Sequence, residues 1–276
     1  MQFEIFGNKT NPALVCVPGL LGGPEDFRGM TEVFEKDYCI MIMDPNSERR
    51  KLGLTNLTQE VMQEVSFNSS ANDIADALKD TNINQAYLLG VSLGGKIVYD
   101  FAIKFPELFL GGVVTDVGPG SFEDSELYRF VDKIVQETNL NLTWPELKID
   151  LQNRIADRSM RSLIQTQITY PNQKPPGNWK TAMKNFRKML HRQNIEDQFE
   201  GLKAVDDLLT KQGSMIDVLQ SQHYSGISLS SVPEIQLLKS IRLHSISNSS
   251  HFIHITHKPV IQDLVAKMLQ RWKLST

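Results

Sequence analysis

The chain has 276 residues, of which 41% are hydrophobic and 22% charged, and its formal net charge is −3. This composition is typical of a globular protein that is large enough to bury a core without disulfides or structural metal. The small negative charge argues against a nucleic-acid partner, and no apolar run approaches the length of a membrane span. We therefore expect a protein that binds neither nucleic acid nor a membrane.

Cysteine usage and the first residues predict a cytoplasmic protein. Cys16 and Cys39 are the two cysteines; both lie in apolar runs, and their spacing matches no metal site. Buried thiols of this kind are typical of a reducing compartment. The first residues lack the basic region and apolar stretch of a secretory signal. We predict no metal and no organic cofactor.

The first part of the chain alternates short apolar runs with segments of helical periodicity. Strands are predicted at residues 3–6, 13–17, 38–43, 86–89 and 111–115. Helices are predicted at residues 24–34, 66–79 and 96–105. Continuous apolar strands that alternate with amphipathic helices are typical of a parallel sheet covered on both faces.

The pattern becomes wholly helical after Gly118-Pro119-Gly120. Helices are predicted at residues 125–137, 146–158, 160–167, 179–190 and 195–209. Strands return at residues 215–219 and 241–246, and a last helix is predicted at residues 259–272. The fold class is therefore α/β, with a mostly parallel sheet flanked by helices. Residues 1–120 and 211–276 would form the core, and residues 121–210 an inserted helical cap.

A glycine-flanked serine joins a predicted strand to a predicted helix in Gly90-Val91-Ser92-Leu93-Gly94. The order strand, G-x-S-x-G, helix is the context of a nucleophile elbow, in which the serine hydroxyl projects from a tight turn. The pattern predicts Ser92 as a nucleophile and the Leu93 N–H group as an oxyanion donor. The alternative is a glycine-rich turn in which Ser92 only caps the helix.

A nucleophilic serine needs a base, and the six histidines are residues 191, 223, 244, 251, 254 and 257. His251 follows the last predicted strand in a polar loop. Loops at the carboxyl ends of parallel strands share one edge of the sheet, so this loop lies at the same edge as the elbow. We predict His251 as the base. His254 and His257, further along, are the alternatives, and any of the three could instead be a surface or capping histidine.

The base needs a carboxylate, and two aspartates are candidates. Asp116 closes the predicted strand that follows the elbow helix, whereas Asp217 lies inside the next apolar run. The loop after that run, residues 220–226, contains no acid. Position favours Asp116, although a turn before Gly118 could also explain an aspartate there.

A second oxyanion donor is predicted in the glycine-rich segment after the second strand, at the N–H group of Leu20. The predicted cap would line an apolar pocket with Phe122, Tyr128, Leu163, Trp179 and Phe186. Aromatic residues at helical spacing are also typical of the interior of the cap itself.

These motifs together resemble the α/β-hydrolase superfamily, and more narrowly the YbfF-like esterases and their mitochondrial relatives. The resemblance rests on the segments 18–22, 90–96, 115–119 and 250–254. That subgroup takes its acid from the strand after the elbow helix, which matches Asp116. Two positions depart from it: Pro18 stands where the first loop usually begins with His, and Val91 where a His usually precedes the nucleophile.

The predicted function is that of a serine hydrolase. Ser92, His251 and Asp116 would cleave short- to medium-chain acyl esters, or thioesters, through an acyl-enzyme, in a monomer or homodimer. The same triad also serves carbon–carbon hydrolases and lyases. A second alternative is a catalytically weak ligand-binding or sensor protein on the same scaffold, which the losses at Pro18 and Val91 favour.

Overall fold

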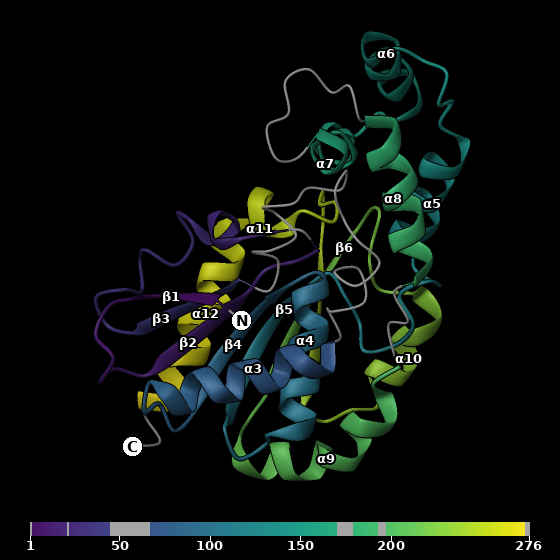
Figure 1. Ribbon diagram of the computed structural model, residues 1–276. Helices are drawn as coiled ribbons and strands as arrows, with labels where there is room; N and C mark the ends of the chain where they lie inside the picture. The colour runs from purple at the N-terminus through teal and green to yellow at the C-terminus, as the bar shows by residue number, and fades with distance from the viewer. Residues whose placement is uncertain (1, 21, 45–66, 170–178, 193–196, 274–276) are drawn as a thin grey trace.

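The computed structural model (Figure 1) describes residues 2–20, 22–44, 67–169, 179–192 and 197–273. Within them, seven strands form one sheet in the order β1-β3-β2-β4-β5-β6-β7. Their bounds are β1 (Gln2–Phe6), β2 (Ala13–Val17), β3 (Cys39–Asp44), β4 (Ala86–Val91), β5 (Phe109–Thr115), β6 (Ile216–Ser221) and β7 (Ile241–Ile246). Only β1 runs antiparallel to its neighbour β3. The predicted mostly parallel sheet is confirmed.

Helices cover both faces of the sheet, which explains why β2, β3 and β4 are buried along their whole length. One face packs against α3 (Phe67–Asp80), α4 (Leu93–Lys104) and α9 (Phe199–Gln212). The other face packs against α12 (Lys258–Lys273) and the short 3₁₀ helix η1 (Pro24–Phe27). Side chains alternate along each strand, so Val15 and Val17 point to the first face while Leu14 and Cys16 point to the second.

The helix predicted at residues 24–34 is wrong beyond its first turn. Only η1 is helical, and turns follow it. Gly29 has φ +69°, in the left-handed region, which ends the helical path. Phe27, Met30 and Phe34 are nevertheless buried, as their spacing predicted. Periodicity therefore located the buried face but not the backbone conformation.

In the described part of the chain, four helices follow one another after β5, and side chains cap the first two. They are α5 (Glu126–Glu137), α6 (Trp144–Arg154), α7 (Arg158–Thr169) and α8 (Trp179–Arg192). Ser125 caps α5 by accepting a hydrogen bond from the Tyr128 N–H group. Thr143 and Glu146 form a capping box, so α6 begins two residues before its predicted start. Three further short helices are η2 (Leu229–Ser231), α10 (Val232–Ile235) and α11 (Ile253–Thr256).

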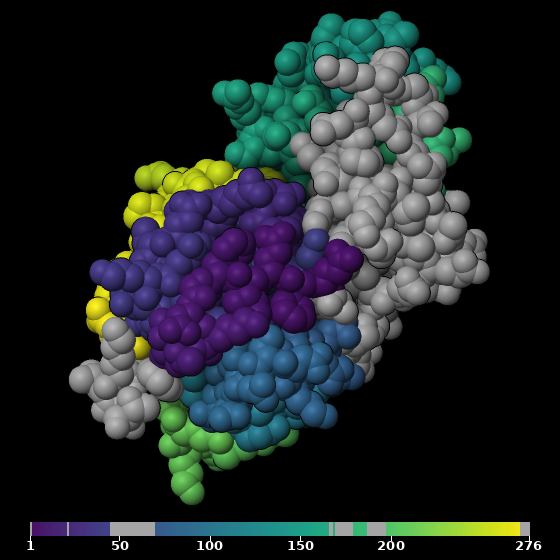
Figure 2. Space-filling view, turned by 60° about the vertical axis from the view of Figure 1, so that its left-hand side comes forward, coloured from purple at the N-terminus to yellow at the C-terminus, as the bar shows by residue number. Residues whose placement is uncertain are grey.

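Helices α5–α8 pack mainly on one another and lie beyond one end of the sheet (Figure 1). In Figure 2 the teal residues of this segment protrude beyond the purple and blue residues. Their shared interior contains Val131, Leu151, Ile164 and Met183, one from each helix. In contrast, α9 buries Phe199, Leu202 and Leu209 against the sheet core. The described part of the predicted cap region, residues 121–210, therefore contains one group of mutually packed helices and one helix that packs on the sheet.

Candidate active site

The turn between β4 and α4 holds Ser92 in a strained conformation. Ser92 has φ +50° and ψ −119°, which few residues other than glycine adopt. Its N–H group donates to the carbonyl of Thr115 at 2.8 Å, which fixes the turn against the end of β5. A Cβ atom at Gly94 would overlap the carbonyl oxygen of Val17, so glycine is needed where the helix passes β2. The local geometry is that of a nucleophile elbow.

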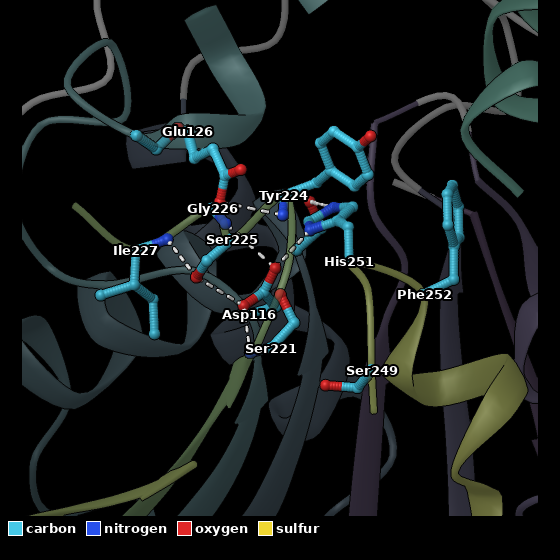
Figure 3. Close-up of polar contacts among 12 residues, drawn as sticks. Asp116, Glu126, Ser221, Tyr224, Ser225, Gly226, Ile227, Ser249, His251 and Phe252 are labelled. Carbon is cyan, nitrogen blue, oxygen red and sulfur yellow. Dashed lines mark hydrogen bonds and ion pairs between the residues drawn. The ribbon is translucent and has the colours of Figure 1, made fainter. Parts of the chain in front are cut away.

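The structure brings Ser92, His251 and Asp116 together in one hydrogen-bonded chain. The His251 Nε2 atom lies 2.8 Å from Ser92 Oγ, and Nδ1 lies 2.7 Å from Asp116 Oδ2. Asp116 is completely buried and His251 is 6% exposed. A buried carboxylate facing Nδ1 accepts a hydrogen bond from the Nδ1–H group, so the proton stays on Nδ1 and the Nε2 lone pair is directed at the serine hydroxyl. Figure 3 shows the Asp116–His251 half of this arrangement.

Asp116 is held by donors on both carboxylate oxygens. It follows β5 with φ +52°, and its own N–H group donates to the Leu219 carbonyl at 2.7 Å. Oδ1 accepts from the Ser221 N–H group at 2.8 Å and from Ser225 Oγ at 2.9 Å. Oδ2 accepts from the Gly226 N–H group at 3.0 Å (Figure 3). These donors stabilise the charged carboxylate in its buried position.

Sequence reasoning missed the role of the segment that binds Asp116. Residues 222–226, which we call the Asp116-binding loop, were noted only for lacking an acid. The loop supplies Ser225 Oγ and the Gly226 N–H group, and Gly226 also forms a parallel bridge with Val117. A Cβ atom at Gly226 would overlap the Asp116 carbonyl oxygen. The small residues Ser225 and Gly226, shortly after a predicted strand, were the signal in the sequence that could have indicated this contact.

The loop that carries His251 is tied to the Asp116-binding loop. The Gln222 N–H group donates to Ser249 Oγ at 3.2 Å, and the His223 N–H group donates to the Ser249 carbonyl at 3.1 Å. In the other direction, the Asn248 N–H group donates to Gln222 Oε1 at 2.7 Å. His251 and Asp116 are therefore positioned by loops that hold each other.

The alternative acid and bases lie elsewhere. Asp217 is buried within β6, and its Oδ1 lies 2.8 Å from His244 Nε2 on β7. His257 Nδ1 lies 2.8 Å from Thr256 Oγ1. His254 is buried in α11; burial, together with nearby His251 and Lys258, lowers its pKa to about 3. The structure brings His251 to Ser92, rather than His254 or His257.

One predicted oxyanion donor, Leu93, belongs to the elbow, and the other, Leu20, belongs to the loop after β2. Leu93 is the first residue of α4, and the first N–H groups of a helix have no partner within it. Leu20 follows Gly19, where a Cβ atom would lie 3.2 Å from the Val91 carbonyl oxygen. The loop after β2 therefore passes directly against the elbow. A Cβ atom at Gly19 would also lie 3.4 Å from Ser92 Cβ, and the Leu20 N–H group stays a predicted donor.

The predicted pocket residues divide into two groups. Trp179 and Phe186 are buried in the interior of α5–α8. Phe122, Tyr128 and Leu163 are half-buried against that interior, and the rings of Phe122 and Tyr128 are 5.8 Å apart. Leu20, Tyr224 and Phe252, which lie outside the predicted cap region of residues 121–210, pack on the same cluster. The apolar cluster thus reaches the neighbours of Ser92 and His251.

The described residues contain neither a candidate metal site nor a helix that could span a membrane. In residues 2–20, 22–44, 67–169, 179–192 and 197–273, no group of three or more His, Cys, Asp or Glu side chains could hold a metal ion. In the same residues, no helix has the length and apolar character needed to cross a membrane.

Comparison with known sequences agrees with the fold. The alpha/beta hydrolase fold family matches residues 12–258. The chain is 20% identical over 264 residues to the Danio rerio sn-1-specific diacylglycerol lipase ABHD11, a match that covers 92% of this chain and 77% of that protein. It is 29% identical over 131 residues to the Mus musculus serine hydrolase-like protein, covering 46% of this chain and 39% of that protein. The chain thus spans less than half of that mouse relative.

Solved structures share the architecture at low sequence identity. MGS-M2, an alpha/beta hydrolase from a Medee basin deep-sea metagenome library, has a TM-score of 0.68 at 15% identity, covering 98% of this chain and 94% of its own. The meta-cleavage product hydrolase of Pseudomonas fluorescens IP01 has a TM-score of 0.65 at 15% identity, covering 98% and 93%. Because the family match extends over most of the sequence and the fold agrees with it, this chain belongs to the α/β-hydrolase family.

Proposed function

We propose that this protein is a serine hydrolase that cleaves carboxylic esters through an acyl-enzyme. One observation carries the proposal: Ser92 Oγ, both ring nitrogens of His251 and the Asp116 carboxylate form a continuous hydrogen-bonded chain at a strained elbow. That arrangement removes a proton from a hydroxyl without a metal or cofactor. Membership of a hydrolase family supports the assignment.

The proposed reaction has two halves. Ser92 Oγ attacks the acyl carbonyl while His251 Nε2 takes its proton, and the N–H groups of Leu20 and Leu93 stabilise the oxyanion. The tetrahedral intermediate collapses, the carbon–oxygen bond to the alcohol breaks, and His251 returns the proton to the leaving oxygen. Water, deprotonated by His251, then attacks the acyl carbonyl; the bond between the acyl carbon and Ser92 Oγ breaks, His251 returns the proton to Ser92 Oγ, and the acid leaves. Asp116 keeps the proton on Nδ1 and stabilises the imidazolium in both halves.

We propose that α5–α8 form the cap and that the substrate is an acyl ester of short to medium chain length, or the corresponding thioester. Leu20 and Phe252 connect the apolar cluster of α5–α8 to the immediate surroundings of Ser92 and His251. An acyl chain next to the nucleophile would therefore contact apolar side chains. The name of the zebrafish relative, a diacylglycerol lipase, supports acyl ester chemistry.

Cleavage of a carbon–carbon bond is the second candidate. One similar structure is the meta-cleavage product hydrolase. A partial match over 120 residues, at 28% identity, is a Yersinia enterocolitica 2-succinyl-6-hydroxy-2,4-cyclohexadiene-1-carboxylate synthase, covering 44% of this chain and 40% of that protein. Both comparisons favour keeping such substrates in any activity screen.

Labelling with a fluorophosphonate probe, wild type beside Ser92→Ala, tests the proposal. We expect covalent labelling of the wild type and none of the variant. A series of p-nitrophenyl esters of increasing chain length then tests the acyl preference. A folded wild-type protein that is not labelled would contradict an activated serine, and ligand-induced stabilisation without turnover would favour a binding protein. Labelling without esterase activity would favour the carbon–carbon candidate.

A further inference from the structure

The first turn of α5 holds the Asp116-binding loop. The Tyr224 N–H group donates to Glu126 Oε2 at 3.0 Å, and the Leu127 N–H group donates to the Ser225 carbonyl at 3.0 Å. The carbonyl in the second bond belongs to Ser225, whose hydroxyl donates to Asp116 and which directly precedes Gly226. Figure 3 shows Glu126 above the loop, with Asp116 and His251 below it. The Asp116-binding loop is therefore the single short segment that separates helix α5 of the proposed cap from Asp116.

Tyr224 is the strained residue of that segment. It has φ +51°, in the left-handed region that costs a non-glycine residue about 1 kcal/mol or more. Its ring packs on Phe130 of α5, with ring centroids 4.5 Å apart. A strained backbone persists only where its surroundings determine it. Here α5 supplies those surroundings through the Glu126 carboxylate, the Leu127 N–H group and the Phe130 ring.

We propose that Glu126 is a positioning residue: by binding the Tyr224 N–H group it fixes the Asp116-binding loop, and so aligns Asp116 with His251. The inference rests on the proposed function, because it assigns a role toward the same triad. It couples the position of the cap helix α5 to the alignment of the acid. Glu126 would act on the transition state through Asp116 and His251, so its loss should lower kcat more than it changes KM.

The alternative role for Glu126 is helix stabilisation. An acidic residue in the first turn of a helix interacts favourably with the helix dipole. The two roles differ in what Glu126→Gln removes. Glutamine loses the charge, and with it the dipole interaction, but its amide oxygen still accepts a hydrogen bond. A positioning role therefore predicts that Gln rescues what Ala loses.

The experiment compares Glu126→Ala and Glu126→Gln with Glu137→Ala, which removes an exposed acid from the same helix. We expect kcat for a p-nitrophenyl ester to fall about tenfold in Glu126→Ala, the loss of one charge-assisted hydrogen bond, with KM changed by less than about threefold. Glu126→Gln and Glu137→Ala should match the wild type. A Glu126→Ala variant as active as the wild type, or a Glu126→Gln variant as impaired as Glu126→Ala, would overturn the proposal.

A second readout does not depend on turnover. The Nδ1 proton of His251 gives a downfield resonance while it is hydrogen-bonded to a carboxylate, and the resonance can be assigned by its loss in His251→Gln. We expect it to move upfield in Glu126→Ala and to stay in place in Glu126→Gln. If the wild type shows neither labelling nor turnover, the proposed function fails and this resonance still decides the role of Glu126. An unchanged resonance in Glu126→Ala would overturn the positioning role even if the enzyme is active.

Discussion

The ammonium group of Lys96 donates to the carbonyl oxygen of Gly120 at 2.6 Å, and to that of Pro119 at 2.8 Å. Lys96 lies one turn after Ser92 on α4 and is completely buried. The two carbonyls belong to the connection that leaves β5 after Asp116 and leads to α5. The helix that follows Ser92 is thereby attached to the segment from which the proposed cap begins.

We predict that Lys96 makes stability depend on pH above neutrality. Burial lowers its pKa to about 7, against the opposing influence of Asp197 and Asp100, while an unfolded chain keeps the ordinary value of about 10.5. Below pH 7 both states carry the proton and the cost of burying the charge is fully present. Between about pH 7 and 10.5 the folded state releases the proton first, so the free energy of unfolding rises with pH. A neutral amine still has two N–H donors for the two carbonyls.

Denaturant unfolding of the wild type and Lys96→Met at several pH values measures this effect. Relative to the variant, the wild type should gain about 1 kcal/mol per pH unit above pH 7. Lys79→Met, at an exposed position on neighbouring α3, is the control and should follow the wild type. A constant difference between wild type and Lys96→Met from pH 7 to 9 would contradict the prediction.

Replacing the two candidate acids should separate them by activity. In Asp116→Asn the side chain no longer holds the proton on His251 Nδ1, so we expect kcat/KM for an ester to fall by a factor on the order of 10³–10⁴. Asp217 contacts His244 instead, so Asp217→Asn should retain activity within about tenfold. Steady-state kinetics of both variants, with folding checked by circular dichroism, decides the matter. The reverse ranking would transfer the acid role to Asp217.

His254 should make the protein sensitive to acid. Its pKa is lowered from 6.5 to about 3 in the folded state, so between these values the unfolded state binds a proton that the folded state does not. The contribution of His254 to stability is therefore constant above about pH 6.5 and falls as the pH is lowered toward 3. His254→Leu removes this loss, and we expect its free energy of unfolding to decline less than that of the wild type between pH 6.5 and 4.5.

Chemical denaturation at these two pH values provides the measurement. His223→Leu, an exposed histidine in the Asp116-binding loop, is the matched control. Equal declines in His254→Leu and His223→Leu would show that the buried imidazole does not cause the acid sensitivity.

The sequence predicted the parts of the site that depend on local pattern. A buried strand, a glycine-flanked serine and an amphipathic helix are adjacent in the chain, so the elbow at Ser92 could be inferred directly. The edge of the sheet where strands end then placed Asp116 and His251 nearby. What could not be predicted are long-range contacts that neither a motif nor a shared edge of the sheet indicates. Ser225 binds Asp116 across 109 positions, and Tyr224 binds Glu126 across 98.

Two other features of the structure could not be predicted from the local sequence pattern. The helix predicted at residues 24–34 failed because apolar spacing reports which side chains are buried, and turns can bury the same side chains. Lys96 would be expected at the surface from its residue type, and only the tertiary structure provides the two carbonyls that allow its burial.

Ser92, Asp116 and Tyr224 all have φ values between +50° and +52°. Glycine would relieve the backbone strain at each position. At Asp116, however, glycine would leave the Ser225 hydroxyl and the Gly226 N–H group without their acceptor, and at Tyr224 it would remove the ring that packs on α5. At Ser92 it would remove the hydroxyl that faces His251, so relief of strain there conflicts directly with the proposed chemistry.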